Sequence, residues 1–143
     1  MGEARPCRRA FVTGGASGIG AAVVRRLAAD GLSVVCADLD GARAAELAQA
    51  CGATAVALDV TDHERVHAAV RQHGPFDVLV NCAGQDQHAF FTRTTPEDWR
   101  RLLAVNLEAV LRTTHAVLPG MQAAGYGRIV NVASEAGRLG SRG

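Results

Sequence analysis

A turn rich in glycine near the N-terminus carries the first candidate chemistry. Residues 10–20, AFVTGGASGIG, join a short apolar run to glycines and then to a helix-forming run. In a dinucleotide site the strand ends at such a turn, the glycines let the main chain approach a pyrophosphate, and the next helix points free N–H groups at its charge. Gly14, Gly18 and Gly20 are spaced G-x-x-x-G-x-G rather than G-x-G-x-x-G, so the turn alone indicates a nucleotide only weakly.

Acidic, polar and small residues follow the later apolar runs of the chain. They are Asp38, Asp59, residues 81–84 (Asn81, Cys82, Ala83 and Gly84) and Ser134. Asp38 follows the glycines by about the interval at which an acid reaches the adenosine ribose of a dinucleotide. A carboxylate there accepts hydrogen bonds from the ribose hydroxyls and repels a 2′-phosphate, and neither Ser17 nor Leu39 is basic. The pattern favours NAD over NADP, with an ordinary turn acid as the alternative for Asp38.

The elements that must position these residues alternate between strand and helix. Short apolar runs predict strands at 9–13, 33–37, 54–58, 76–80 and 128–133. Helical apolar spacing predicts helices at 18–30, 40–51 and 61–73, and a long helix that opens at residue 95. Thr61 is expected to cap the third helix in a capping box with Glu64, and Pro119 to kink the long helix near its end.

This alternation predicts an α/β fold. Near-continuous Val, Ala and Leu strands are typical of a parallel sheet that helices cover on both faces. Right-handed crossovers then give a doubly wound, Rossmann-like sheet of order 3-2-1-4-5, in one domain over residues 1–143. Ligands of such sheets bind beyond the carboxyl ends of the strands, where the candidate residues stand.

Composition narrows the classes of partner. An apolar fraction of 48% with 20% charged residues is typical of a globular chain, and a formal net charge of +1 argues against nucleic acid. No apolar run approaches the roughly 18 residues that span a bilayer, and the N-terminus has no apolar signal region, so we expect a cytoplasmic protein with no membrane partner. The four cysteines are far apart without metal-ligand spacing, which predicts reduced thiols and no metal.

Six motifs together resemble the short-chain dehydrogenase/reductase family: TGGASGIG (13–20), Asp38, LDV (58–60), NCAG (81–84), VNL (105–107) and IVNVAS (129–134). The resemblance implies a nicotinamide cofactor and the interconversion of a small-molecule alcohol and ketone. It places adenine against Asp59 and Val60. The cofactor-binding residues expected from it are Gly14, Ser17, Gly18, Ile19, Gly20, Asp38, Leu39, Asp59, Val60, Asn81, Ala83 and Gly84.

The same resemblance implies two catalytic residues. Ser134 would hold and polarise the substrate carbonyl, and Asn106 would bind a water in the proton relay. An asparagine within an otherwise apolar helix is unusual unless its side chain has a role. From the residues alone, Ser134 is equally well a plain serine between a strand and a loop.

The chain departs from the family at the general acid/base. The family's tyrosine, in a Y-x-x-x-K motif, follows the serine by thirteen residues, which counts to position 147. The 143 residues contain one tyrosine, Tyr126, and no lysine. We therefore expect the polypeptide alone to be inactive and to lack the family's last strands and helices, which leaves the strand at 128–133 as an uncovered edge. A completing polypeptide or homo-oligomer, a truncated fragment, and a non-catalytic dinucleotide-binding module remain the alternatives.

Substrate and minor sites are less defined. The segments HAVLPGM and GRIVNVASEAGRLGS resemble the branch that oxidises hydroxyacyl-CoA thioesters, including alicyclic ones such as 2-hydroxycyclohexanecarboxyl-CoA, with reduction of 3-oxoacyl chains on an acyl carrier as the neighbouring possibility. His63 and His67 have the i, i+4 spacing of zinc ligands but no third ligand in sequence, so a solvated helix face is the better interpretation. His88, Phe90 and Phe91, in the loop after the fourth strand, either line the substrate mouth or have a plain packing role.

Overall fold

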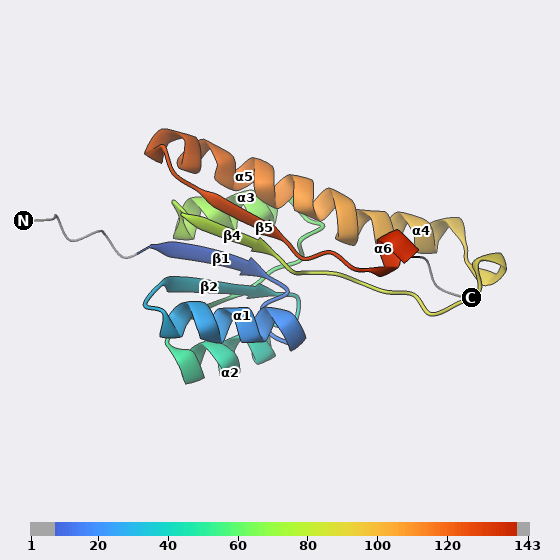
Figure 1. Ribbon diagram of the computed structural model, residues 1–143, viewed down its shortest axis with the longest axis horizontal. Helices are drawn as coiled ribbons and strands as arrows, with labels where there is room; N and C mark the ends of the chain where they lie inside the picture. The colour runs from blue at the N-terminus through green and yellow to red at the C-terminus, as the bar shows by residue number, and fades with distance from the viewer. Residues whose placement is uncertain (1–7, 140–143) are drawn as a thin grey trace, which may run out of the picture.

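The computed structural model describes residues 8–139, which form a five-stranded parallel sheet between two layers of helices (Figure 1). The strand order is β3-β2-β1-β4-β5, so the predicted doubly wound order is confirmed. The strands are β1 (Arg9–Thr13), β2 (Ser33–Asp38), β3 (Thr54–Ala57), β4 (Val78–Asn81) and β5 (Arg128–Asn131). The helical elements are α1 (Gly18–Ala29), α2 (Gly41–Cys51), α3 (His63–His73), the 3₁₀ turn η1 (Phe91–Arg93), α4 (Pro96–Leu103), the π-helical segment η2 (Ala104–Glu108), α5 (Ala109–Ala124) and α6 (Ala136–Leu139).

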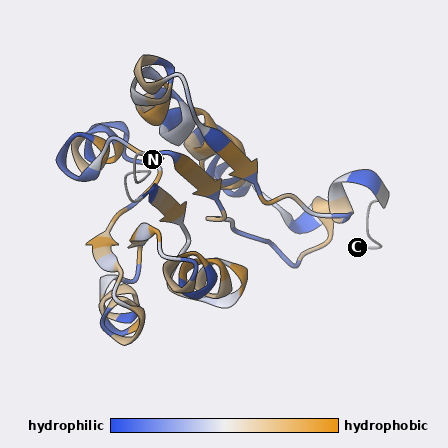
Figure 2. Ribbon diagram, turned by 60° about the vertical axis from the view of Figure 1, so that its left-hand side comes forward, coloured by the Kyte–Doolittle hydropathy of each residue, from blue (hydrophilic) through white to orange (hydrophobic). Residues whose placement is uncertain are grey.

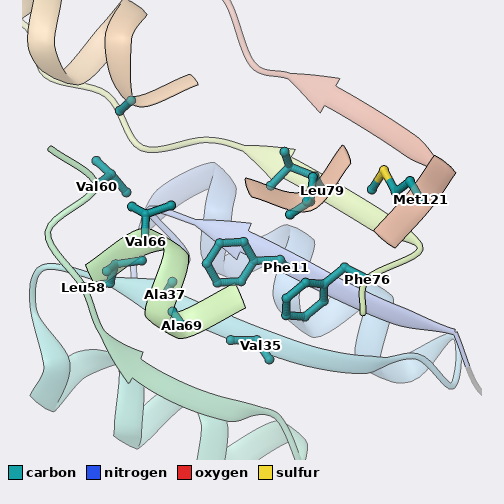
Figure 3. Close-up of a cluster of buried hydrophobic side chains, with 12 residues drawn as sticks. Phe11, Val35, Ala37, Leu58, Val60, Val66, Ala69, Phe76, Leu79 and Met121 are labelled. Atoms are coloured by element: carbon teal, nitrogen blue, oxygen red, sulfur yellow. The ribbon is translucent and has the colours of Figure 1, made fainter. Parts of the chain in front are cut away.

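The two faces of the sheet bury separate apolar cores. Alternate residues of β1 point to opposite faces. Phe11 enters the core beneath α3 and α5, where it stacks on Phe76 with ring centroids 5.1 Å apart (Figure 3). Ala10 and Val12 enter the core beneath α1 and α2. The strands accordingly lie toward the hydrophobic end of the colour scale in Figure 2, whereas the helices also carry hydrophilic stretches.

The start of α3 corrects one prediction. Its N-cap is Asp62, whose carboxylate accepts the N–H of Arg65 at 3.0 Å, and the predicted cap at Thr61 is wrong. The Thr61 hydroxyl instead donates to Oδ1 of Asp59 at 2.7 Å, which withdraws it from the helix end. The predicted opening of the long helix is confirmed, because Thr95 and Asp98 form a capping box with Pro96 in the first turn.

The long helical region is continuous but not uniform. It runs through α4, η2 and α5, and α5 continues past Pro119 to Ala124. The π-helical turns of η2 contain Asn106. Such segments are rare and are frequent at functional sites.

β5 is an outer strand of the described sheet, as predicted. Its Val130 is in register with the buried Val80 of β4 but is 51% exposed. The reason is the placement of α1 and α2, which cover the sheet from β1 toward β3 and leave this face of β5 open (Figure 1). Within residues 8–139, no helix is long and apolar enough to cross a bilayer.

Candidate nucleotide-binding site

A cavity of about 540 Å³ lies at the carboxyl ends of the strands. This volume lies within the usual range for small-molecule sites. Eleven of the twelve residues predicted to bind the cofactor line it: Gly14, Ser17, Gly18, Ile19, Gly20, Asp38, Leu39, Asp59, Val60, Ala83 and Gly84. The lining also includes five residues that were not predicted, namely Leu58, Cys82, Gln85, Val105 and Val132. Four of these five lie inside the motifs quoted above, and the fifth, Gln85, directly follows the predicted Gly84.

The glycine turn packs against the turn that follows β4. A Cβ atom on Gly14 would lie 2.7 Å from the main chain of Ala83, and one on Gly20 would lie 1.9 Å from the carbonyl oxygen of Gly14. Gly18 has open space around it but a φ of +51°, which favours glycine. Two of the glycines are thus required by close approach and the third by backbone conformation.

Asp38 is held at the edge of the cavity by main-chain donors. The N–H of Ala16 donates to Oδ2 and the N–H of Asp40 to Oδ1, both at 2.9 Å. Each carboxylate oxygen has two lone pairs, so each can accept a further hydrogen bond. The carboxylate therefore fixes the glycine turn and can still accept hydrogen bonds from a bound ligand.

Asp59 presents a second carboxylate. Its Oδ1 accepts the hydroxyl of Thr61 at 2.7 Å and the N–H of Thr61 at 2.8 Å. These hydrogen bonds lower the pKa of Asp59, so the side chain is ionised at neutral pH. Leu39 and Ile19, 76% and 63% exposed, provide the large apolar side chains of the lining near the two acids and the glycines.

Asn81 lies beneath the cavity rather than in its lining. It is buried, its Nδ2 donates to Oδ1 of Asn131 at 2.9 Å, and its Oδ1 accepts the hydroxyl of Thr113 at 2.6 Å. These bonds join β4 to β5 and to α5. The side chain thus supports the central strands from which the next turn, Cys82 to Gly84, projects.

Asn106 does not line the cavity but fixes one of its walls. Its Nδ2 donates to the carbonyl of Gln85 at 2.7 Å, and its Oδ1 accepts the N–H of Gln85 at 2.8 Å. Both ends of the carboxamide are therefore committed to the main chain of one residue. The predicted role of Asn106 in a proton relay stays a prediction.

Ser134 and Tyr126 lie at opposite ends of β5. Ser134 is exposed two residues beyond the cavity-lining Val132, and its hydroxyl accepts the N–H of Ala136 at 3.2 Å. Tyr126 precedes β5, and the guanidinium groups of Arg8 and Arg128 lie 4.6 and 4.8 Å from its ring centroid. The structure therefore does not bring the tyrosine to the candidate site.

The other candidate side chains either lie outside the cavity lining or are thiols that are not ionised at neutral pH. Burial and the nearby Asp38 raise the pKa of the Cys36 thiol to about 11, and burial also raises the pKa of Cys82, so both thiols are protonated at neutral pH. Phe91 stacks on Trp99 with ring centroids 5.4 Å apart and does not line the cavity, and neither does Phe90. The described residues include no group of three or more His, Cys, Asp or Glu that could hold a metal ion.

Comparison with known proteins gives a consistent result. The family model described as "short chain dehydrogenase" matches residues 8–143. The 2-keto-3-deoxy-L-fuconate dehydrogenase of Xanthomonas campestris pv. campestris is 38% identical over 92% of this chain and 44% of its own length. The acetoacetyl-CoA reductase of Allochromatium vinosum is 39% identical over 95% of this chain and 60% of its own. The 2-dehydro-3-deoxy-L-rhamnonate dehydrogenase (NAD(+)) of Sphingomonas sp. is 41% identical over 94% of this chain and 56% of its own length.

The solved structures agree in fold. A short-chain dehydrogenase from Streptomyces avermitilis superposes with a TM-score of 0.90 at 33% identity, covering 99% of this chain and 54% of that protein. The chain thus spans about half the length of the curated relatives and solved structures it matches.

Proposed function

The chain belongs to the short-chain dehydrogenase family, and on that premise we propose that its cavity binds NAD and that the protein takes part in NAD-dependent interconversion of an alcohol and a ketone. The family consists of oxidoreductases, and its members typically use nicotinamide cofactors. When bound, NAD would supply the hydride acceptor. The residues of this chain would bind and orient the nucleotide and the substrate.

The observation that carries the proposal is the fixed carboxylate of Asp38. Its two main-chain hydrogen bonds hold it at the cavity, with lone pairs left for the adenosine ribose hydroxyls. The lining includes no arginine to pair with a 2′-phosphate. A relative whose name specifies NAD(+) supports the same choice.

The lining residues also indicate where the other parts of the nucleotide would bind. The side chain of Ser17 makes no capping hydrogen bond to α1, so the pyrophosphate would take the place of a cap at this helix N-terminus. Adenine would lie against the exposed apolar side chain of Leu39 and beside Asp59 and Val60. The nicotinamide end would reach Gln85, Val105 and Val132, on the side where β5 leads to Ser134.

Catalysis needs a proton donor that these residues do not place at the site. Ser134 would orient the substrate carbonyl through its hydroxyl. The 143 residues contain no lysine, and Tyr126 lies at the other end of β5. We therefore expect the isolated polypeptide to bind nucleotide without turnover, and we propose that a further polypeptide supplies the Tyr and Lys of the family.

The exposed apolar surface supports a partner for the chain. Leu103, Leu107 and Leu111 stand four residues apart along α4, η2 and α5 and are 53%, 53% and 61% exposed. Contiguous exposed apolar side chains mark interaction surfaces. We propose that a completing polypeptide or a second copy of the chain covers this leucine row.

For substrate and location we propose an acyl thioester and the cytoplasm. The name acetoacetyl-CoA reductase, carried by several relatives, agrees with a hydroxyacyl-CoA or 3-oxoacyl substrate, whereas the sugar-acid dehydrogenases among the relatives point to a different class. The free thiols Cys36, Cys51 and Cys82 suit a reducing compartment. Activity assays of the chain with candidate partner polypeptides, using both substrate classes, would separate these proposals.

Nucleotide binding is the direct test. Calorimetric titration of the chain with NAD and NADP should show NAD binding at least 10-fold tighter, because a carboxylate repels the 2′-phosphate. Asp38→Ser should weaken NAD binding by about 10-fold, the value of about one hydrogen bond to a charged group. The control is Asp86→Ser, which changes an exposed acid in the loop after β4. Equal affinities for the two nucleotides, or unchanged NAD binding by Asp38→Ser, would overturn the proposal.

A non-catalytic dinucleotide-binding module is the second candidate, favoured because the described residues line a nucleotide-sized cavity but place Tyr126 at the far end of β5. It predicts the same nucleotide affinities but no turnover with any added polypeptide. Turnover upon addition of a polypeptide that carries the Y-x-x-x-K motif would exclude it.

A further inference from the structure

Three histidine side chains meet where α3 packs against α5. His63 and His67 lie one turn apart on α3, with ring centroids 4.4 Å apart. The ring of His115, on α5, lies 5.6 Å from that of His67 in a T-shaped arrangement. The two helices cover the same face of the sheet (Figure 1). The imidazoles thus form a continuous chain across the helix interface, which the spacing on α3 alone does not reveal.

The central ring has no acceptor for a second proton. His67 is half-buried, and its Nε2 is shielded from solvent without a hydrogen-bond partner in the described part of the chain. A protonated imidazole carries an N–H at both nitrogens. A shielded N–H without an acceptor is unfavourable, so the packed arrangement favours the neutral ring.

The charges around His67 act in the same direction. The guanidinium of Arg71 on α3 and the imidazoles of His63 on α3 and His115 on α5 face the His67 ring, and Glu64 on α3 is the opposing carboxylate. Burial first, and then His63, His115 and Arg71, lower the pKa of His67 below its ordinary 6.5. The unfolded chain therefore takes up this proton at a higher pH than the folded one, and the stabilisation present at neutral pH is lost as pH falls through 6.5 and below.

The cluster connects directly to the candidate nucleotide site. α3 begins at His63, and the segment just before it contains the cavity-lining Asp59 and Val60. Val66 of α3 also packs in the same core as Val60. A displacement of α3 from α5 would therefore disturb the adenine end of the cavity.

We propose that His63, His67 and His115 form an acid-sensitive latch, which holds α3 against α5 at neutral pH and releases α3, with the adenine end of the cavity, when the central ring of His67 takes up a proton. The effect on α3 stands on the cluster itself, whereas the effect on nucleotide affinity rests on the proposed function.

Thermal unfolding of the chain between pH 7.5 and 5.5 tests the latch without any nucleotide. His67→Phe keeps an aromatic ring and removes the titration. The Tm of the wild type should fall by about 4 °C more over this range than that of the variant, the order expected for one side chain whose pKa is lowered on folding. His88→Phe, at a 92% exposed side chain in the loop after β4, should behave as the wild type. Parallel curves for wild type and His67→Phe would overturn the proposal.

A second measurement, NMR of the wild type, does not depend on the folding of any variant. The imidazole proton signals of the wild type, followed by NMR, should show His67 titrating below pH 6.5, and a midpoint at or above 6.5 would overturn the latch. NAD affinity measured at the same pH values should weaken in the wild type and hold in His67→Phe. NAD binding that stays constant while the Tm falls would overturn the coupling, whereas no binding at pH 7.5 would overturn the proposed function and leave the unfolding curves to decide the latch.

Discussion

At the scale of single residues, the carboxamide of Asn106 has the donor and the acceptor that the main chain of Gln85 requires. It donates to and accepts from the main chain of Gln85, and only a carboxamide offers one donor and one acceptor in that arrangement. Gln85 follows Gly84 in the wall of the cavity. Asn106 is therefore a positioning residue, because it acts on the site through the main chain of another residue.

This pairing gives a sharp prediction. Asn106→Ala should lower the free energy of unfolding by about 1–2 kcal/mol through the loss of two hydrogen bonds, and should also weaken NAD binding. Gln85→Ala keeps the main chain and should leave the stability unchanged. Chemical denaturation and hydrogen exchange of the Gln85 N–H would check both, since that N–H should exchange faster only in Asn106→Ala. An equal loss of stability in Gln85→Ala would show that packing of the Gln85 side chain, rather than the hydrogen bonds from Asn106 to the main chain, stabilises this wall.

The sequence could not predict the contacts that join residues far apart in the chain. The glycines, Asp38 and Asp59 could be predicted as cavity residues, because the carboxyl ends of parallel strands collect the positions just after each apolar run. Gln85 and Asn106 are 21 residues apart, and no periodicity relates them. His115 joins His63 and His67 only because α5 packs on α3, and a single sequence does not contain that contact.

At the scale of elements, buried apolar runs made the strands and their order predictable. The residues at which the helices and strands begin and end were harder to predict. β4 begins at Val78 rather than at residue 76, and β5 ends at Asn131 rather than at 133. The wrong cap of α3 has a specific cause. Thr61 and Asp62 are adjacent capping residues, and the choice between them depends on Asp59, which takes the hydroxyl of Thr61.

The α3 cap can be tested by two neighbouring substitutions. Asp62→Ala should cost about 1 kcal/mol of unfolding free energy, because it leaves the N–H of Arg65 without its cap. Thr61→Val should leave α3 intact, since the Thr61 N–H still holds Asp59. Urea denaturation with far-UV circular dichroism would measure both. A loss of helix confined to Thr61→Val would restore Thr61 as the cap.

At the scale of the whole molecule, the sheet is covered unevenly. The strands β3, β2 and β1 lie between helices on both faces, whereas one face of β5 is open. The leucine row on α4, η2 and α5 adds exposed apolar surface. The helices α4 and α5 lie on the same side of β1 as β5 (Figure 1). The nucleotide cavity lies at the carboxyl ends of the strands, so a partner could cover β5 and the leucine row without filling the cavity.

The exposed leucine row predicts the surface through which the chain associates with itself or with a partner polypeptide. Leu107→Arg places a charge in the middle of the leucine row, where the side chain is already 53% exposed, so the fold should tolerate it within about 0.5 kcal/mol. Association of the chain with itself, or with the added polypeptide, should weaken by 10-fold or more, because burying an unpaired charge is costly. Sedimentation velocity over a range of concentrations would measure this, with Gln49→Arg on the solvent face of α2 as a control of equal charge. If Leu107→Arg associates as tightly as Gln49→Arg, the leucine row is not the partner surface, and the open face of β5 with Val130 becomes the surface to test.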